Sequence, residues 1–556
     1  MASQFLFGAE VDRIQDTLFR AARQRQVVGG SYLLAEFGKR AVELANTHHA
    51  RDILIKAGGN FRVLFDSKDD ATAFGRDLAN AYRLLLDASI TIAAPELCNG
   101  NFPEINERIH EEIMRLKRAQ RGETANLQAP STAFCQSSGV GLAYTYQKLP
   151  WLEAEQYISA FASKMGEAGK IGKEFRGVIE EPNDSYLGQI KAHLPDNYKP
   201  LYWPDVDEIA NFDGERANVA YLLADGNNMG KLFKNCDDKE LKLLSKALED
   251  AMCAAIAKPI ESLFQKFYEA EKFKTGEFMP LLPLILAGDD AFVLVPACYA
   301  LDFAQKFCLA FEHALGQSDI FVNLREKLRK KNLDIPPPTM SAAIVFCKGH
   351  YPYHLAYWRG KELLTQTKQM VKAAALETKQ WRSALAFAMI VGSELVTGHE
   401  ADGAYRPSLS PYWIAESDLS LELKKFSLAL RNLLLHRFQL KILPAKRLAE
   451  AEKLFAPEAL PNDDEDWRES LKSWNSQLRK LLDRIEVTDP QQQQLQRIKQ
   501  ALADLGDPVN RDLGHWREVK RPGKHYQAHG LPDLISVWNY AQSFNHSLAE
   551  YREEES

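Results

Sequence analysis

The sequence has no long apolar run, no secretory leader and no strong excess of one charge, and each absence excludes a class of protein. The longest apolar stretches, 279–287 and 384–391, are far shorter than the ~20 residues of a membrane span. The N-terminus has neither the basic nor the apolar region of a signal peptide. Lys plus Arg (69) nearly balance Asp plus Glu (75), for a net charge of −6. We therefore expect a soluble, cytoplasmic protein without membrane contact, and not a polybasic nucleic-acid coat.

Cysteine is also scarce. The seven cysteines form no Cys-x-x-Cys pair, and their number is odd. This pattern argues against a disulfide framework and against a Cys-rich zinc site, and it favours a reducing compartment.

What is present is an ordinary globular composition over 556 residues, with 46% hydrophobic and 26% charged residues. At roughly 150 residues per domain, this length predicts three or four domains. Dominant disorder is excluded, because enough apolar surface is available to build cores.

The chain contains an internal repeat. The first copy has an apolar strand at residues 5–7 and a strand–turn–strand segment at 52–65, and the second has the same features at 219–225 and 284–295. Each hairpin is followed by apolar residues at helical spacing: Phe74, Leu78 and Tyr82 in the first copy, and Phe303, Phe307 and Phe311 in the second. Each copy is predicted to close with a Ser-rich strand, at 137–143 and 340–346 respectively. The order strand, helix, hairpin, helix, strand is typical of a ferredoxin-like split βαβ unit.

The predicted fold class is therefore α+β, with two tandem ferredoxin-like domains, the first degenerate, followed by a C-terminal α-helical domain. We place the boundaries at 1–149, a connector at 150–214, the second domain at 215–398 and the helical domain at 399–556. Beyond residue 396 strand signals fade and helical periodicity dominates, at 421–435, 445–455, 467–485 and 492–505. The basic segment 516–524 is predicted as a loop.

The second copy carries three carboxylates that are candidates for catalysis. Asp225 ends a buried strand, and Asp289 and Asp290 lie at the tip of the hairpin. In a split βαβ sheet the first strand and the hairpin are neighbours, so these carboxylates should converge. Converging carboxylates repel one another unless cations lie between them, and Mg²⁺ or Mn²⁺ bridging nucleotide phosphates fits such oxygen ligands. The alternative is a solvated Asp-Asp turn.

The first copy lacks this set. Gly58, Gly59 and Asn60 stand where the second copy has Gly288, Asp289 and Asp290, and Asp12 is offset from the position of Asp225. The segment 29–34 is predicted to open a helix, where the free N–H groups of Gly30 and Ser31 would suit a phosphate. A plain N-cap by Ser31 is the alternative.

These motifs together resemble the large polymerase/cyclase subunit of type III CRISPR effector complexes, the CRISPR-associated Cas ten/Cmr two-like family. Four segments carry the resemblance. Residues 14–34 look like the opening of its first palm domain, and residues 341–368 look like the strand and helix that close its second palm. Residues 225–230 (Asp-Gly-Asn-Asn-Met-Gly) look like its Asp-x-Asp-x-Met-Gly motif, and residues 287–290 (Ala-Gly-Asp-Asp) look like its Gly-Gly-Asp-Asp motif. The likeness spans about residues 3–400.

The resemblance implies a nucleotidyltransferase that converts ATP, its substrate, into cyclic oligoadenylates when the guide complex binds target RNA. Asp225, Asp289 and Asp290 would be catalytic and would ligate Mg²⁺ or Mn²⁺. Nucleotide contacts are implied at Gly226, Asn227, Gly288, Ser341, Lys368, Gly30 and Ser31. For Lys368 a solvated helix lysine is the alternative. The implied partners are other type III subunits, guide RNA and target RNA.

The sequence also departs from the family pattern. Ala287 replaces the first motif glycine and Asn227 replaces the second motif aspartate, which puts the metal geometry in question. The zinc-binding cysteines between the palms are missing, and there is no His-Asp dipeptide, so we do not expect HD nuclease activity. Two alternatives stay open: a catalytically weak, ATP-binding scaffold subunit, or a related palm enzyme that makes a different nucleotide messenger.

Overall fold

The computed structural model describes most of the chain. The described residues are 4–12, 14–19, 23–56, 59–119, 132–139, 141–150, 152, 154–171, 190, 192–195, 200, 202–269, 278–333, 335–391, 394–395, 408–441, 443, 445–454, 472–474, 476–477, 480, 489–506, 517–521 and 524–544.

The first sheet is five-stranded and antiparallel, with the order β2-β3-β1-β4, and β5 also pairs with β1. Its strands are β1 (Phe5–Val11), β2 (Ala50–Ile55), β3 (Asn60–Phe65), β4 (Ile90–Ile92) and β5 (Glu96–Leu97). Its helices are α1 (Ile14–Leu18), α2 (Gln24–Thr47), α3 (Lys68–Leu86) and α4 (Phe102–Ala119). Helix α3 begins where the Ser67 hydroxyl accepts from the N–H groups of Asp69 and Asp70, a standard N-cap.

The first hairpin and the helix after it are confirmed. The apolar face of α3 is buried, since Phe74, Leu78 and Tyr82 are each at most 1% exposed, and the Phe74 ring lies 4.9 Å from that of Phe7 on β1. The prediction of a closing strand at 137–143 is wrong, because β4 closes this sheet directly after α3. Among the described residues of that segment there is only an isolated bridge between Phe134 and Leu142. Its glycines and serines favour a turn over a strand.

In the sequence, a region of short elements lies between the two sheets. It holds β6 (Thr145–Gln147), β7 (Gln156–Ile158), α5 (Ala160–Ala168), α7 (Val206–Ala210) and the 3-10 helix η3 (Asn211–Arg216). Strands β6 and β7 pair only with each other among the described residues.

The second sheet is seven-stranded, with the order β13-β12-β11-β8-β10-β9, and β14 pairs with β12. Its strands are β8 (Asn218–Gly226), β9 (Leu282–Ala287), β10 (Asp290–Pro296), β11 (Met340–Lys348), β12 (Ser383–Val391), β13 (Glu394–Leu395) and β14 (Tyr412–Ile414). Its helices are α8 (Met229–Lys234), α9 (Asp238–Glu269), the 3-10 helix η4 (Ala297–Tyr299), α10 (Ala300–Gly316), α11 (Asp319–Lys330) and α12 (Tyr353–Thr378). The run β11-β8-β10-β9 has the same connectivity and antiparallel pairing as β4-β1-β3-β2 in the first sheet. The second hairpin and the buried Phe303, Phe307 and Phe311 of α10 are confirmed.

The C-terminal part mixes helices with strands. Its helices are α13 (Leu421–Lys424), α14 (Leu430–Leu440), α15 (Ala445–Lys453), α17 (Asp489–Leu505) and α18 (Gly530–Ser536). The expectation that strands end near residue 396 is wrong, since β14 extends the second sheet. The predicted loop at 516–524 is wrong too, because β15 (Arg517–Arg521) and β16 (Lys524–Ala528) form a hairpin. Alternating residues of β15, Arg517 and Val519, are buried, which is the period of a strand.

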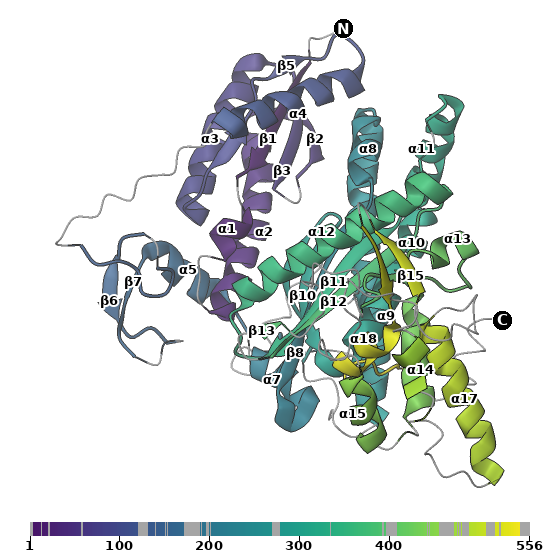
Figure 1. Ribbon diagram of the computed structural model, residues 1–556. Helices are drawn as coiled ribbons and strands as arrows, with labels where there is room; N and C mark the ends of the chain where they lie inside the picture. The colour runs from purple at the N-terminus through teal and green to yellow at the C-terminus, as the bar shows by residue number, and fades with distance from the viewer. Residues whose placement is uncertain are drawn as a thin grey trace.

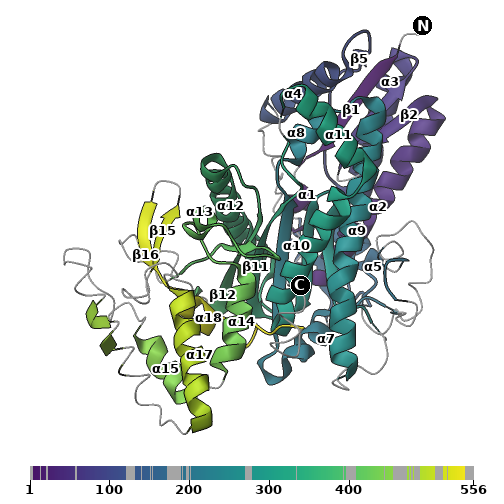
Figure 2. The same cartoon turned by 90° about the vertical axis from the view of Figure 1, so that its right-hand side faces the viewer.

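The two sheets occupy different parts of the molecule. In Figure 1 the first sheet lies at the top near the N-terminus, and α15 and α17 lie at the bottom; the view in Figure 2 keeps this separation. One apolar core joins the second sheet, helices α9 and α10 and the C-terminal helices. No helix of the described part combines the length and apolar character needed to cross a bilayer.

Candidate active site

The hairpin of the second sheet turns in two residues. Asp290 is paired with Ala287, so Gly288 and Asp289 form the turn. Gly288 has φ +61°, which favours glycine at the first position of a tight hairpin turn. Asp289 is thereby held at the tip, and Asp290 begins β10.

Asp225 lies directly opposite Asp290 in the antiparallel pair of β8 and β10. On its other side, Asp225 is opposite Ser341 of β11. Asp289 lies against the next residue of β8: a Cβ added to Gly226 would be only 2.9 Å from both Cβ and Oδ2 of Asp289. The structure therefore brings Asp225, Gly226, Gly288, Asp289 and Asp290 to one end of two adjacent strands.

Burial and the charge of Asp225 both act on the pKa of the two hairpin carboxyl groups. Burial, followed by the charge of Asp225, raises the pKa of Asp289 to about 7. Desolvation and the charge of Asp225 raise the pKa of Asp290 as well, although Asp290 as a whole residue is exposed. A side-chain hydrogen bond to Asp225 acts in the same direction. Without a cation between them, such carboxyl groups favour sharing a proton over carrying two charges.

Lys368 of α12 supplies the compensating positive charge. Its Nζ lies 2.5 Å from Oδ1 of Asp225, with side chains 40% and 24% exposed respectively. In the described part of the chain, no other Lys, Arg or His forms an ion pair with Asp225, Asp289 or Asp290. A basic group with this reach can also meet an anionic ligand at the same end of the sheet.

The donor set fits a hard divalent cation in its chemistry. Within the described ranges, no three His, Cys, Asp or Glu side chains are close enough together to form a ready-made metal cage. Mg²⁺ does not require one, because it is usually held by one or two carboxylates together with water and substrate phosphates. Asp225 and Asp290, facing each other across two strands, match that requirement.

The side chains of Asn227 and Ser341 are hydrogen-bonded to each other. Asn227 Nδ2 donates to Thr339 Oγ1 at 3.1 Å, and its Oδ1 accepts from Ser341 Oγ at 2.9 Å. Asn227 is 8% exposed and Ser341 is fully buried. In this arrangement the pair fastens the end of β8 to the start of β11.

The first sheet has different residues at the positions equivalent to those of the site. Its strand register corrects the alignment of the two copies that the sequence suggested. Glu10, not Asp12, takes the place of Asp225, because Glu10 pairs with Asn60 and with Thr91 as Asp225 pairs with Asp290 and Ser341. Asp12 corresponds to Asn227: it accepts from Ser89 Oγ at 2.8 Å and from Thr91 Oγ1 at 2.6 Å. Both Glu10 and Asp225 are the last residue but one of their strands, but the sequence does not mark where these strands end.

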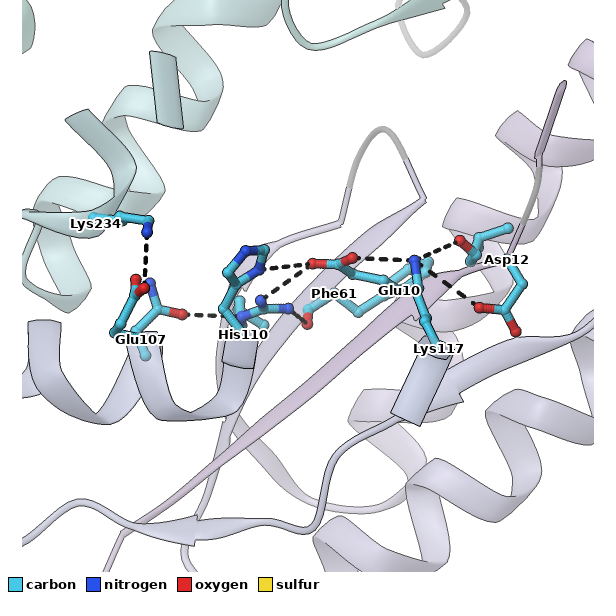
Figure 3. Close-up of polar contacts among 10 residues, drawn as sticks. Glu10, Asp12, Phe61, Glu107, His110, Lys117 and Lys234 are labelled. Carbon is cyan, nitrogen blue, oxygen red and sulfur yellow. Dashed lines mark hydrogen bonds and ion pairs between the residues drawn. The ribbon is translucent and has the colours of Figure 1, made fainter. Parts of the chain in front are cut away.

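Glu10 is surrounded by protein cations, a feature that the sequence analysis missed. Burial by itself would raise its pKa, but the hydrogen bond from His110 and the charges of Lys117 and Arg62 outweigh burial and lower it to about 2. Figure 3 shows Glu10 between His110 and Lys117, with Asp12 beyond Lys117. Lys117 lies in the basic stretch of α4, where sequence offered no sign of a buried partner.

The predicted helix start at residues 29–34 is wrong. Helix α2 begins at Gln24, so Gly30 and Ser31 lie in its second turn and the argument from free N–H groups does not apply. The glycines serve packing instead: a Cβ on Gly29 would come within 1.7 Å of the Met165 carbonyl oxygen, and one on Gly30 within 2.5 Å of Met165 Cε. Gly29 and Gly30 thus let α5 approach α2 closely.

Comparison with known proteins gives one family match and a likeness of fold. Residues 218–376 match the family Cas10/Cmr2, second palm domain. The crystal structure of Csm1 in T. onnurineus is similar with a TM-score of 0.50 and 14% identity, over 89% of this chain and 67% of that chain. The Csm1-Csm4 cassette in complex with AMPPNP gives a TM-score of 0.50 and 14% identity, over 97% and 70%. At such identities the likeness concerns the fold alone. A search of curated proteins gives no match.

Proposed function

We propose that this Cas10-like chain, whose residues 218–376 form a second palm domain of the Cas10/Cmr2 family, is a Mg²⁺-dependent nucleotidyltransferase. Its substrate would be ATP and its product cyclic oligoadenylate, made when a type III CRISPR complex binds target RNA. The observation that carries the proposal is the pairing of Asp225 with Asp290 on adjacent strands, with Asp289 in the turn between β9 and β10. A scaffold has no evident need for Asp289 and Asp290, two carboxyl groups whose pKa is raised by burial and by the charge of Asp225.

The shared connectivity of the two sheets supports an architecture of two tandem ferredoxin-like palm domains. We place them at 1–149 and 215–398, with a connector at 150–214 and a largely helical domain at 399–556. The first palm would be degenerate, because Asn60 replaces Asp290 and the carboxylate of Glu10 is already paired with Lys117.

The roles of individual residues follow from their positions. Asp225 and Asp290 would hold the cation, with Asp289 as a further ligand. When bound, the cation would supply the charge that neutralises the phosphates and activates the attacking 3′-hydroxyl. Gly288 leaves the turn without side-chain bulk, so that a nucleotide can approach its backbone. Lys368 would contact the triphosphate.

The partners proposed for this chain are other type III subunits, guide RNA and target RNA. The support is the similarity in fold to Csm1, of which one similar structure is a Csm1-Csm4 cassette in complex with AMPPNP. That complex was formed by the other protein, and it motivates ATP and a companion subunit as ligands to test here.

The test uses the assembled complex, labelled ATP, Mg²⁺ and matching target RNA. We expect cyclic oligoadenylates, identified by mass spectrometry, with wild type and none with Asp289→Ala plus Asp290→Ala. The matched control is Asp69→Ala plus Asp70→Ala, an Asp-Asp pair in the first turn of α3, which should leave the product unchanged. Asp290→Asn, which keeps the side-chain shape, separates lost chemistry from lost folding.

Absence of product in wild type, or undiminished product in the Asp289/Asp290 double variant, would overturn the proposal. Two observations favour a second candidate, an ATP-binding scaffold with weak or no turnover: Lys368 occupies Asp225, and Asn227 is tied to Thr339 and Ser341. ATP bound without conversion would support the scaffold. A product of different mass would indicate a palm enzyme that makes another nucleotide messenger.

A further inference from the structure

In both sheets a lysine forms an ion pair with the carboxylate at the same register position. Glu10 and Asp225 occupy the same register position, opposite the first residue of the hairpin's second strand. Lys117 contacts Glu10 and Lys368 contacts Asp225. Both lysines come from the helix that follows the fourth strand of its sheet, α4 in one case and α12 in the other. The pairing is therefore a feature of the repeat, and the two copies can be compared directly.

In the first sheet this ion pair is enclosed. Lys117 Nζ lies 3.1 Å from Glu10 Oε2 and also donates to the Val11 carbonyl oxygen at 3.1 Å. Arg62 Nη2 at 3.6 Å and His110 Nδ1 at 3.4 Å approach the other oxygen of Glu10, as Figure 3 shows for His110. The Glu10 side chain is only 12% exposed. Removal of Lys117 still leaves Arg62 and His110 beside this carboxylate.

In the second sheet the equivalent ion pair, between Lys368 and Asp225, is exposed to solvent. Lys368 is the only cation ion-paired with the three aspartates in the described part of the chain, and 40% of its side chain is exposed. Its Nζ lies on Asp225, the carboxylate that faces Asp290 across the strands. The ammonium group contacts Oδ1 of Asp225, and its charge also acts on Asp289 and Asp290. A cation shared by these carboxylates would therefore compete with Lys368.

We propose that Lys368 is a replaceable counter-ion, which neutralises Asp225 until a divalent cation displaces it. This inference rests on the proposed function, because it concerns the same site. Displacement opposes binding of the cation alone, since an ion pair must be broken. It favours binding of the cation together with a nucleotide, because the freed ammonium group can then contact a phosphate. Lys368 thereby couples the two ligands, whereas Lys117 is a permanent counter-ion that closes the first sheet to cations.

The test is Mn²⁺ binding by the full chain, followed by electron paramagnetic resonance with and without a non-hydrolysable ATP analogue. Breaking a half-exposed ion pair costs up to about 1 kcal/mol, so Lys368→Gln should bind Mn²⁺ alone about threefold to fivefold more tightly than wild type. The increase in Mn²⁺ affinity on adding the nucleotide should be smaller in this variant, because the coupling is reciprocal and depends on the lysine. Lys368→Arg, which keeps the charge, should behave more like wild type.

Two variants serve as controls. Lys372→Gln removes an exposed lysine one turn further along α12 that has no ion pair among the described residues, and it should leave Mn²⁺ affinity unchanged. Lys117→Gln should create no Mn²⁺ site, because Arg62 and His110 remain on Glu10.

The outcomes separate this inference from the proposed function. Loss of Mn²⁺ binding in Asp225→Asn would support the metal site. If Lys368→Gln then bound Mn²⁺ no more tightly than wild type, the role of Lys368 as a counter-ion would be overturned and the metal site would stand. Mn²⁺ binding that is absent, or insensitive to both Asp225→Asn and Asp290→Asn, would overturn the counter-ion and the metal site together. A new Mn²⁺ site in Lys117→Gln would overturn the contrast between the two sheets.

Discussion

At the scale of single residues, the residue that follows the first strand of each sheet holds the strand ends together beside the site. The residue after each first strand, Asp12 or Asn227, donates its backbone N–H to the residue before the fourth strand, Ser89 or Thr339, at 3.0 and 2.8 Å. Its side chain bonds to two hydroxyl groups in both copies. Asn227 therefore fills a structural position in the second sheet, as Asp12 does in the first.

Replacing Asn227 by alanine should destabilise the second sheet. The change leaves the buried hydroxyls of Thr339 and Ser341 without their partner, which costs about 2 kcal/mol. Thermal unfolding of the full chain should show a lower midpoint. Asn235→Ala is the control, because the Asn235 side chain donates an exposed hydrogen bond to the Lys231 carbonyl oxygen, and the loss of this bond should cost about 0.5 kcal/mol. Equal effects of the two changes would contradict the structural role of Asn227.

At the scale of elements, the contact between α2 and α5 depends on missing side chains. A Cβ on Gly29 would lie 1.7 Å from the carbonyl oxygen of Met165 and 2.7 Å from the nitrogen of Gly169. Because both neighbours are backbone atoms, rotamer changes cannot relieve the overlap. The two helices would have to move apart.

Gly29→Ala should therefore destabilise the first unit by about 1–3 kcal/mol, as overpacking does. Gly38→Ala is a control on the same helix, since its Cβ would meet only the Lys56 carbonyl oxygen, at 3.5 Å. It should stabilise the helix by about 0.5–1 kcal/mol, because alanine has the higher helix propensity. Thermal unfolding of both variants checks the opposite signs, and a destabilised Gly38→Ala or a neutral Gly29→Ala would contradict this account.

At the scale of the whole molecule, the first unit is fastened to the second sheet at several points. Phe19, directly after α1, packs its ring 4.4 Å from that of Tyr357 and 5.7 Å from that of Phe292. Gln24 Nε2 donates to the buried Tyr221 hydroxyl at 2.6 Å. The ion pair of Lys234 with Glu107, at 2.7 Å, joins α8 to α4, and Figure 3 shows it beside the Glu10 cluster. Helix α8 follows Asp225 closely in sequence, so the position of the first unit bears on the site.

Phe19→Ala should loosen this contact at a cost of about 2–3 kcal/mol, because a large apolar ring is removed from an aromatic cluster. Hydrogen exchange should become faster in β10 and α12, with little change in α14. Phe438→Ala, at a phenylalanine that is 41% exposed on α14, is the control. Unchanged protection of β10 and α12 in Phe19→Ala would show that the two units are held together elsewhere.

The amino-acid pattern was sufficient for features that depend on neighbours in the chain. The hairpins at 50–65 and 282–296, the apolar faces of α3 and α10 and the likeness to the Cas10/Cmr2 second palm are confirmed. These features are local, because strands alternate every two residues, helices repeat every 3.6 residues, and a tight turn favours glycine at positive φ. The positions of Asp225, Asp289 and Asp290 follow from the same rules.

Other features came only from contacts between distant segments. The closing strand at Ile90–Ile92, the equivalence of Glu10 with Asp225, and the strand at 412–414 depend on pairing register, which sequence spacing does not specify. Lys117 and Lys368 meet their carboxylates from helices that lie more than a hundred positions further along the chain. Only packing brings such a lysine to a particular carboxylate, because the sequence alone does not distinguish it from a solvated lysine on the same helix.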